Sequence, residues 1–525
     1  MASTVKAKSY LSLFVINLAS QVVGFVFQTL TARFFGASTD LDGYLAGLAI
    51  PQYLILIINT GVSSSLLPAY YGKAQEKRDQ FLGNLFMFLA FFCSVIVAVG
   101  ALFAPFLFHL FFHELPAATA AVGITVCRYG FISVLTAVLI NFLSSVHYIH
   151  KKFAYQALVP AIGQAVTVAL MAVLIGLGIN SLLIAYLAAQ VLQVLMLLFH
   201  SVRVPRGKLS LRDPEVMAFL ILTIPMMLST CFTKSTGLVE RYLAGMAAKG
   251  AAGTISHVDY ASKIVAAIAG LTTNVLPILI YPDIAAAAAD KDHGKFNRIV
   301  NEGLFLAFFI VVPIIAFGRV AGLDLIQIFF QRGRFTAYDS ARVDVFFQIY
   351  LFSLVARAMG GVTSNAMYAL KLVNWVAIIG PLEASLYIAY TYWLTRKMGA
   401  TGIPLGFMIY FTLSLAWSAV LISCKTRTAG VAIMANYSDY LKVLGAGLVA
   451  FLVGHFVGAV FSWNLARILG AGLACAASYL LCCHLVHIVV VRHGWLAARS
   501  FLAKFKGVPS SKSPNAQLPQ PGSTP

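Results

Sequence analysis

Residues 85–112 read LFMFLAFFCSVIVAVGALFAPFLFHLFF, a run that contains no Asp, Glu, Lys or Arg. An α-helix rises about 1.5 Å per residue, so about 20 such residues cross the hydrocarbon core of a bilayer. On both sides of this run, about fourteen apolar stretches of spanning length fill residues 9–491. The sequence therefore predicts an all-α integral membrane protein with about fourteen transmembrane helices.

The composition agrees with a membrane protein. Hydrophobic residues make up 60% of the 525 residues and charged residues only 10%, far from the values of a soluble domain. The first apolar run has no small-residue cleavage site after a short core, so we expect a permanent helix rather than a signal peptide. Residues 509–525 are rich in Ser, Pro, Gln and Gly, which predicts a disordered end to a cytoplasmic tail at 493–525.

The net charge of +19 is concentrated in alternate short loops. Lysine and arginine in every second loop are typical of the cytoplasmic side of a membrane protein. Both termini are therefore predicted to be cytoplasmic, although the loops at 319–342 and 396–397 break the alternation. This distribution argues against nucleic acid as the partner of the positive charge.

Several cations lie inside the apolar stretches. A lysine or arginine at the bilayer centre costs several kcal/mol unless it faces protein or water. The sequence thus predicts a hydrated path with positive charge, as in a transporter for an anionic substrate. The cations at membrane depth are Arg33, Arg128, Lys234, Arg241, Lys263 and Arg357.

Enzymatic alternatives find little support in the sequence. With helices of the expected length, the longest loops have about twenty residues. These loops hold no pair of acidic residues at a spacing suited to catalysis. No P-loop motif is present, so we expect no ATP hydrolysis by this chain. The seven cysteines have no metal-ligand spacing. We therefore expect a secondary transporter with no cofactor and no metal centre.

Several short motifs occur in a specific order over about 390 residues that are expected to form membrane-spanning helices. Each motif alone is weak evidence of a family, but their order and spacing together are specific. The motifs are Gly24-Phe25, Ala32-Arg33-Phe34-Phe35-Gly36-Ala37, Asp42-Gly43-Tyr44, Ile50-Pro51, Leu67-Pro68, Val239-Glu240-Arg241, Gly253-Thr254-Ile255-Ser256, Tyr260-Ala261-Ser262-Lys263, Gln331-Arg332-Gly333-Arg334-Phe335-Thr336 and Tyr368-Ala369. In this order and spacing the sequence resembles the MurJ/MviN family of lipid II flippases, in the multidrug/oligosaccharidyl-lipid/polysaccharide exporter superfamily.

The resemblance implies two six-helix lobes around a central cavity, with two added helices. It places the N-terminal lobe at 1–203, the C-terminal lobe at 204–424 and the last two helices at 425–492, where an apolar groove would hold a lipid tail. A polyprenyl-pyrophosphate headgroup cannot cross hydrocarbon unaided, and buried cations can replace part of its hydration. Alternating access would then carry the headgroup across the bilayer.

The chain departs from the family at cationic and acidic positions of the first two helices. The arginines that the family carries in these two helices are absent. The family's arginine after Tyr-Ala is replaced by Lys263, which keeps the charge but cannot bind a phosphate with two parallel hydrogen bonds. These departures favour a headgroup other than lipid II. The neutral residues at the changed positions are Gln21, Phe27, Gln28, Ile55, Leu56 and Thr60.

The candidate site residues follow from charge and from the resemblance. We expect the cavity cations Lys263, Arg241, Lys234 and Arg33 to bind substrate. The resemblance assigns cation coupling to Glu240, with Glu383 as a companion, and leaves Na⁺ or H⁺ open as the coupled ion. Asp42 and Asp259 are candidates for gating, although simple ion pairs, Arg33 with Asp42 and Lys263 with Asp259 at i−4, explain them equally well.

The function predicted first is a flippase in the bacterial inner membrane. It would move a polyprenyl-pyrophosphate-linked oligosaccharide, of the exopolysaccharide or O-antigen type, from the cytoplasmic to the periplasmic leaflet. Two alternatives stay open: a lipid II flippase of peptidoglycan synthesis, and an exporter of small drugs. The expected partners are the lipid-linked glycan and the bilayer, together with a glycan polymerase or glycosyltransferases.

Overall fold

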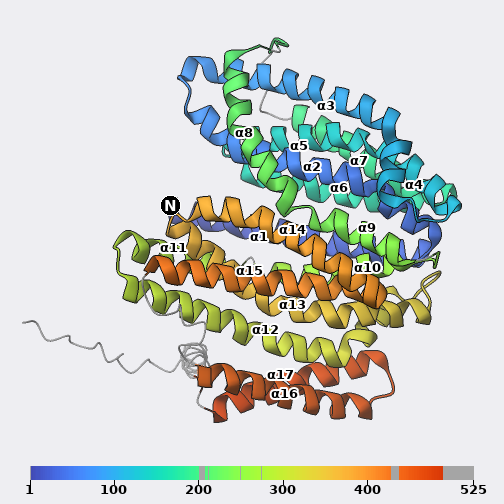
Figure 1. Cartoon of the computed structure of the whole chain (residues 1–525), viewed down its shortest axis with the longest axis vertical. Helices are drawn as coiled ribbons and strands as arrows, with labels where there is room; N and C mark the ends of the chain where they lie inside the picture. Colours follow the sequence, from blue (N-terminus) through green and yellow to red (C-terminus); the bar gives the residue numbers. More distant parts are fainter. Residues whose placement is uncertain are drawn as a thin grey trace, which may run out of the picture.

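The structure is a computed structural model, and it describes residues 2–199, 207–210, 212–248, 250–273, 275–426, 437–486 and 488. Within these ranges the chain is almost entirely helical, with seventeen α-helices, two short 3-10 helices and no strand (Figure 1). Eleven helical segments are long and apolar enough to cross a membrane. The predicted all-α membrane fold, with two lobes around a central cavity and two added helices, is confirmed.

The N-terminal lobe is built from helices that pack around α2, α5 and α7. A buried core that includes Leu66, Phe108 and Phe142 joins them. The helices of this lobe are α1 (Ala2–Phe35), α2 (Thr39–Tyr71), α3 (Gln75–Phe112), α4 (Ala117–Gly130), α5 (Ile132–Ile149), α6 (Phe153–Val173) and α7 (Asn180–Phe199).

The C-terminal lobe packs mainly around α13. The fully buried side chains of Tyr350, Phe347 and Leu351 mark its core. Its helices are α9 (Thr236–Ala248), α10 (Thr254–Thr273), α11 (Val275–Ala289), α12 (His293–Phe330), α13 (Ala337–Ala369), α14 (Val373–Met398) and α15 (Gly402–Thr426).

Helix α8 (Pro214–Thr233) lies between the lobes, against α2 and α3 on one side and α14 on the other. Its start is tied to the N-terminal lobe by an ion pair between Glu215 and Lys73 and by a 2.6 Å hydrogen bond from Asn84 to Asp213. Asp213 also caps the helix by accepting from the amide of Glu215. The seventh span therefore bridges the two lobes.

Three of the predicted spans consist of two helices each: α4 with α5, α8 with α9, and α10 with α11. When each pair is counted as one span, the seventeen helices correspond to fourteen spans. The first break falls at Phe131, which follows Gly130, and the second at Lys234 and Ser235. Near each break the side chains of Ser133 and Ser235 donate to backbone carbonyls of the preceding helix, which satisfies groups that the break frees.

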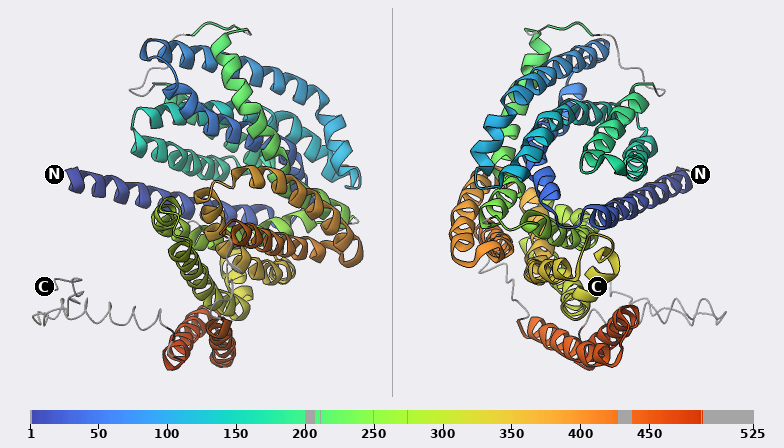
Figure 2. Two further views of the ribbon diagram at one scale, coloured as in Figure 1. Left: turned by 60° about the vertical axis from the view of Figure 1, so that its left-hand side comes forward. Right: turned by 90° about the vertical axis from the view of Figure 1, so that its right-hand side faces the viewer.

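The last two helices, α16 (Tyr437–Val460) and α17 (Asn464–Leu485), form a hairpin that packs on α12 (Figure 2). Arg467 pairs with the buried Asp324 at 3.2 Å, and the hydroxyl of Tyr479 donates to the carbonyl of Phe309 at 2.8 Å. The hairpin lies at one edge of the molecule, beyond the C-terminal lobe.

Lysine occupies the left-handed backbone region in three helix-to-helix turns, at Lys151, Lys291 and Lys371. The turns that end α5 and α13 close in the same way. The amide of Lys151 donates to the carbonyl of Tyr148 at 2.9 Å, and that of Lys371 to Tyr368 at 3.0 Å. These turns join corresponding helices of the two lobes.

Candidate functional site

Two adjoining cavities lie where the lobes meet. The smaller, of about 320 Å³, is lined by residues of α2, α9 and α10 and by Lys234, and we call it the charged pocket. The larger, of about 650 Å³, is lined by residues of α1, α2, α5, α6 and α7 together with Arg241 and Lys263, and we call it the amide chamber. Gln52 and Arg241 line both, so the two cavities share a wall.

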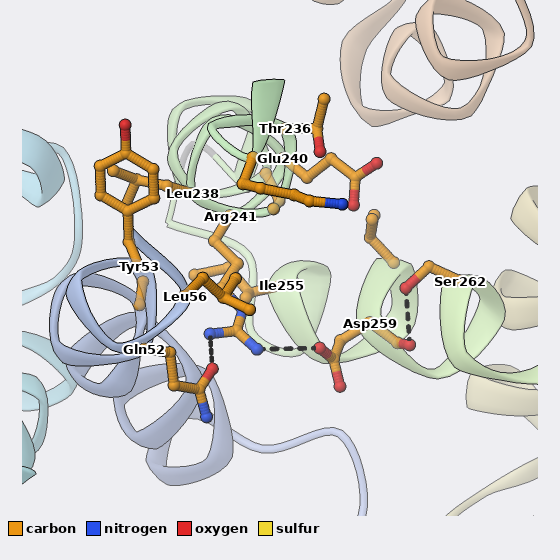
Figure 3. Close-up of a pocket in the computed structure, with 15 residues that line it drawn as sticks. Gln52, Tyr53, Leu56, Thr236, Leu238, Glu240, Arg241, Ile255, Asp259 and Ser262 are labelled. Carbon is orange, nitrogen blue, oxygen red and sulfur yellow. Dashed lines mark hydrogen bonds and ion pairs between the residues drawn. The ribbon is translucent and has the colours of Figure 1, made fainter. Parts of the chain in front are cut away.

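Arg241 and Lys263 belong to one polar network that crosses this wall, and Figure 3 shows the part of it formed by Arg241, Gln52 and Asp259. The guanidinium of Arg241 donates to Oε1 of Gln52 at 2.8 Å and pairs with Asp259 at 3.4 Å. Asp259 also pairs with Lys263 at 2.6 Å, and Lys263 donates to Gln28 at 3.3 Å. Two cations of the C-terminal lobe are thus held by one shared carboxylate and by two amides of the N-terminal lobe.

The local sequence explains this arrangement. Asp259 and Lys263 are four residues apart on α10, so their side chains lie on the same helical face. Arg241 lies on α9, which packs against α10 and α2. Asp259 is almost buried, whereas the side chain of Lys263 is 38% exposed and reaches the cavity. Lys263 and Arg241 can therefore offer donors to an anion that enters.

Glu240 and Lys234 also line the charged pocket. Figure 3 shows Glu240 directed away from Arg241, its neighbour in the chain. The Oε1 atom of Glu240 is buried and has no hydrogen-bond partner among the described residues. The charges of Arg241 and of Arg357 act on it. A buried carboxylate with a free oxygen is able to accept a cation or a proton.

Glu383 lies elsewhere, in a separate cavity of about 90 Å³ between α13, α14 and α15. Ser414 and Tyr368 line the same cavity. The two acids suggested for coupling, Glu240 and Glu383, are therefore not brought into one site.

Asp42 on α2 caps the N-terminus of α10, across the boundary between the lobes. Its carboxylate accepts from the amide of Gly253 at 2.8 Å and from the amide and hydroxyl of Ser256 at 2.7 and 2.5 Å. These are donors that the first turn of a helix leaves unpaired. Gly253 has φ +83°, and an added Cβ would lie 2.6 Å from the carbonyl oxygen of Ala37.

A second contact lies beside the first. The amide of Arg334 donates to the carbonyl of Arg33 at 3.0 Å, and Gly333, at φ +62°, leaves no room for a Cβ beside that carbonyl. We call these contacts of Asp42 and Arg33 with the turns before α10 and α13 the outer closure, because the loop charges predict that this end faces the periplasm. The side chain of Arg33 is exposed and lines neither cavity.

The amide chamber was not predicted from the sequence. Seven amide side chains line it. Gln28 and Gln52 belong to the network above, and the other five are Asn59, Asn141, Gln164, Gln190 and Gln193. Neutral polar residues are costly inside a bilayer, so their presence in apolar stretches was the available signal. The sequence alone did not show that five separate helices bring them to one cavity.

Comparisons with known proteins agree with this geometry. A family model described as lipid II flippase MurJ matches residues 31–471. The chain is 22% identical over 479 residues to the lipid II flippase MurJ of Burkholderia cenocepacia, covering 85% of this chain and 89% of the relative. It is 22% identical over 457 residues to the probable lipid II flippase MurJ of Bdellovibrio bacteriovorus, covering 81% and 86%.

Two solved structures have a similar fold. A lipid II flippase MurJ in an inward closed conformation superposes with a TM-score of 0.79 at 19% identity, covering 91% of this chain and 99% of that one. An inward-facing multidrug resistance transporter of the MATE family gives a TM-score of 0.62 at 15% identity, covering 79% and 96%. The fold is that of these transporters, which are not enzymes.

Proposed function

Since the chain belongs to the MurJ family, we propose that it is a lipid II flippase that serves peptidoglycan synthesis. It carries the polyprenyl-pyrophosphate-linked headgroup from the cytoplasmic to the periplasmic leaflet of a bacterial inner membrane, with both termini in the cytoplasm. The names and coverage of the relatives support this cargo over the exopolysaccharide or O-antigen unit that the substituted arginines favoured.

The observation that carries the proposal is the network of Arg241, Asp259 and Lys263 in the wall shared by the two cavities. A pyrophosphate loses its hydration when it leaves water, and that loss is severe unless charged donors replace the solvent. Arg241 offers a planar fork of donors to phosphate oxygens, and Lys263 a mobile point charge. Both lie at the boundary between the lobes, where alternating access requires the headgroup to bind.

Alternating access assigns a role to the outer closure. While Asp42 caps α10, the turns before α10 and α13 lie against the end of α1 and close this end of the boundary between the lobes. Release to the periplasm requires these contacts to break while the headgroup stays bound to Arg241 and Lys263. Asp42 therefore gates the path, and Asp259 offsets part of the charge of the two cations when no cargo is present.

We assign coupling to Glu240 rather than to Glu383. Glu240 lines the charged pocket and has a buried oxygen with no partner among the described residues, whereas Glu383 lies in the separate cavity. The buried hydroxyls of Tyr350 and Tyr387, also without a partner in the described part of the chain, lie within electrostatic range of Glu240. Either Na⁺ or H⁺ could bind there, and a Glu240→Gln variant whose transport lost its response to both gradients would support the assignment.

A second candidate cargo is a different polyprenyl-linked glycan, of the exopolysaccharide or O-antigen type. One observation favours it: neutral amides and apolar side chains, including Gln28 and Phe27, line the amide chamber where the resemblance expects charged residues. In that case a glycan polymerase or glycosyltransferases would act on either side of the transport step.

Complementation distinguishes the two cargoes. The chain is expressed in a strain depleted of its own lipid II flippase, and lipid-linked intermediates on each face of the inner membrane are quantified. We expect growth and a fall in cytoplasmic-face lipid II. Two results together would favour the second candidate. The protein would insert well but leave lipid II on the cytoplasmic face of the depleted strain, and deletion of its gene in the source strain would accumulate another lipid-linked glycan.

A further inference from the structure

We propose that the amide chamber binds the uncharged sugars of the cargo and acts as the specificity-determining part of the site, while Arg241 and Lys263 bind the phosphates. This inference rests on the proposed function, since it concerns the headgroup of the same lipid-linked substrate. The residues assigned to sugar recognition are Asn59, Gln164 and Gln193, none of which the sequence analysis singled out.

The charge distribution of the chamber is one-sided. Among the described residues no carboxylate lines it, and the only charged lining residues are Arg241 and Lys263, both from the C-terminal lobe. The wall formed by the N-terminal lobe offers amides, together with hydroxyls such as those of Tyr44 and Thr167. An amide both donates and accepts hydrogen bonds, as sugar hydroxyls and acetamido groups do. The described residues of this wall therefore match a neutral carbohydrate and include no cationic side chain that would pair with an acidic sugar.

Some of the amides already have partners and so have a structural role. Gln190 accepts a hydrogen bond from Thr136. Asn141 donates to the carbonyl of Asn59 at 3.1 Å and accepts from Ser63 at 3.0 Å. These bonds hold α2, α5 and α7 together behind the chamber.

Other amides have free hydrogen-bonding groups. Among the described residues, the buried Oδ1 atom of Asn59 has no hydrogen-bond partner, and the side chains of Gln164 and Gln193 make no hydrogen bond either. Gln193 lies directly over Gly163, where any Cβ would collide with its amide group. A buried polar group without a partner, such as Oδ1 of Asn59, is costly, and a ligand that pairs with it removes that cost. The exposed Gln164 and the half-buried Gln193 offer further donors and acceptors to the same ligand.

The dimensions suit a small oligosaccharide. The chamber has a volume of about 650 Å³, in the range of ligand sites that enclose most of a small molecule. It begins at the network that would bind the pyrophosphate, since Arg241 and Lys263 line it. A sugar attached to the pyrophosphate therefore enters the chamber as soon as the phosphates reach the two cations.

The test measures what the sugar adds to binding. Purified full-length protein in detergent is titrated with a short-chain polyprenyl pyrophosphate, with the same lipid carrying a neutral N-acetylglucosamine disaccharide, and with one carrying glucuronic acid. Native mass spectrometry reports the bound fraction. We expect the neutral disaccharide to tighten binding about tenfold, as a few additional hydrogen bonds would, and the acidic sugar to give no gain.

Matched variants identify the residues responsible. The double variant Gln164→Leu with Gln193→Leu should lose most of the gain from the neutral disaccharide and keep its affinity for the sugar-free lipid. Gln21→Leu is the control, because Gln21 lies exposed on α1 and lines neither cavity. Thermal unfolding of the variants checks that the fold is intact.

The outcomes separate this inference from the proposed function. Equal affinity of the wild-type protein for the sugar-free and neutral-sugar lipids, or a gain from glucuronic acid as large as from the neutral disaccharide, overturns the inference and leaves the flippase proposal standing. Absence of binding to any pyrophosphate lipid overturns the flippase proposal itself. The comparison of neutral and acidic sugars uses only wild-type protein, so it decides the question even where the double variant does not fold.

Discussion

Arg241 on α9 donates a 2.8 Å hydrogen bond to Gln52 on α2, and this bond joins the two lobes inside the cavity. Lys263 on α10 makes the corresponding contact with Gln28 on α1 at 3.3 Å. An arriving pyrophosphate would compete with both amides for the same cations. The cargo itself can therefore weaken the contacts that hold the lobes in their unloaded arrangement.

The first prediction concerns the need for this positive charge. Arg241→Gln should reduce the rate of lipid flipping in proteoliposomes at least tenfold, because a neutral side chain cannot replace the phosphate's lost hydration. Lys263→Arg should retain activity, since the charge remains. Arg128→Gln is the control, because Arg128 is an exposed cation on α4 that lines neither cavity. An equal defect in the control would show that general loss of charge, not the network, causes the effect.

A second prediction concerns Asp259, the carboxylate shared by the two cations. Asp259→Asn removes their counter-ion without changing the shape of the side chain. We expect tighter binding of pyrophosphate lipids by severalfold and slower turnover, because release becomes harder. Equilibrium binding and flipping rate are measured on the same preparation. A variant that binds less tightly would mean that Asp259 only positions Arg241 and Lys263.

The third prediction concerns the outer closure. Asp42→Ala leaves the first-turn amides of α10 without their cap, a loss that typically costs about 1 kcal/mol. The closed arrangement should therefore be less populated, and a cysteine placed at Ser262 in the charged pocket should react faster with an impermeant maleimide added from the periplasm. The parent protein without the added cysteine reports the background from the native thiols. Unchanged labelling would exclude Asp42 as a gate.

A pair of glycines provides a fourth, matched test. Gly250 and Gly253 have nearly the same backbone angle, φ +84° and +83°, but a Cβ on Gly250 meets nothing while one on Gly253 meets the carbonyl of Ala37. Alanine at either position costs about 1–2 kcal/mol for the left-handed conformation. Only Gly253→Ala should also increase periplasmic labelling of the cavity. Equal labelling in both variants would attribute the effect to the turn rather than to the contact between lobes.

The sequence predicted the transmembrane helices for physical reasons, and it named Arg241 and Lys263, which line the cavities, as substrate-binding cations, a role that stays a prediction. Long apolar runs have few alternatives in a bilayer, and charges such as Arg241 and Lys263 are too costly there to lack a function. It did not predict the breaks at Phe131 and Lys234, because a break whose groups are satisfied locally leaves no mark in the hydropathy pattern. Nor did it predict the amide chamber, whose residues meet only in three dimensions.

The prediction for Arg33 illustrates the same limit. Its charge at the end of an apolar run is compatible with a cavity or with an outer turn, and only the packing of α1 against the turn before α13 decides between them. Glu383 is similar: its position in the eleventh span was compatible with a site shared with Glu240, but the two side chains line different cavities.

The three turns with lysine in the left-handed conformation affect how the chain inserts into the membrane. Glycine would relieve the backbone at Lys151, Lys291 and Lys371 by about 1–2 kcal/mol per turn, yet each keeps a positive side chain. During biogenesis, loops that carry lysine resist translocation and fix the direction in which neighbouring helices enter. We therefore expect these lysines to direct insertion, and the finished fold retains a small local backbone strain at each of them.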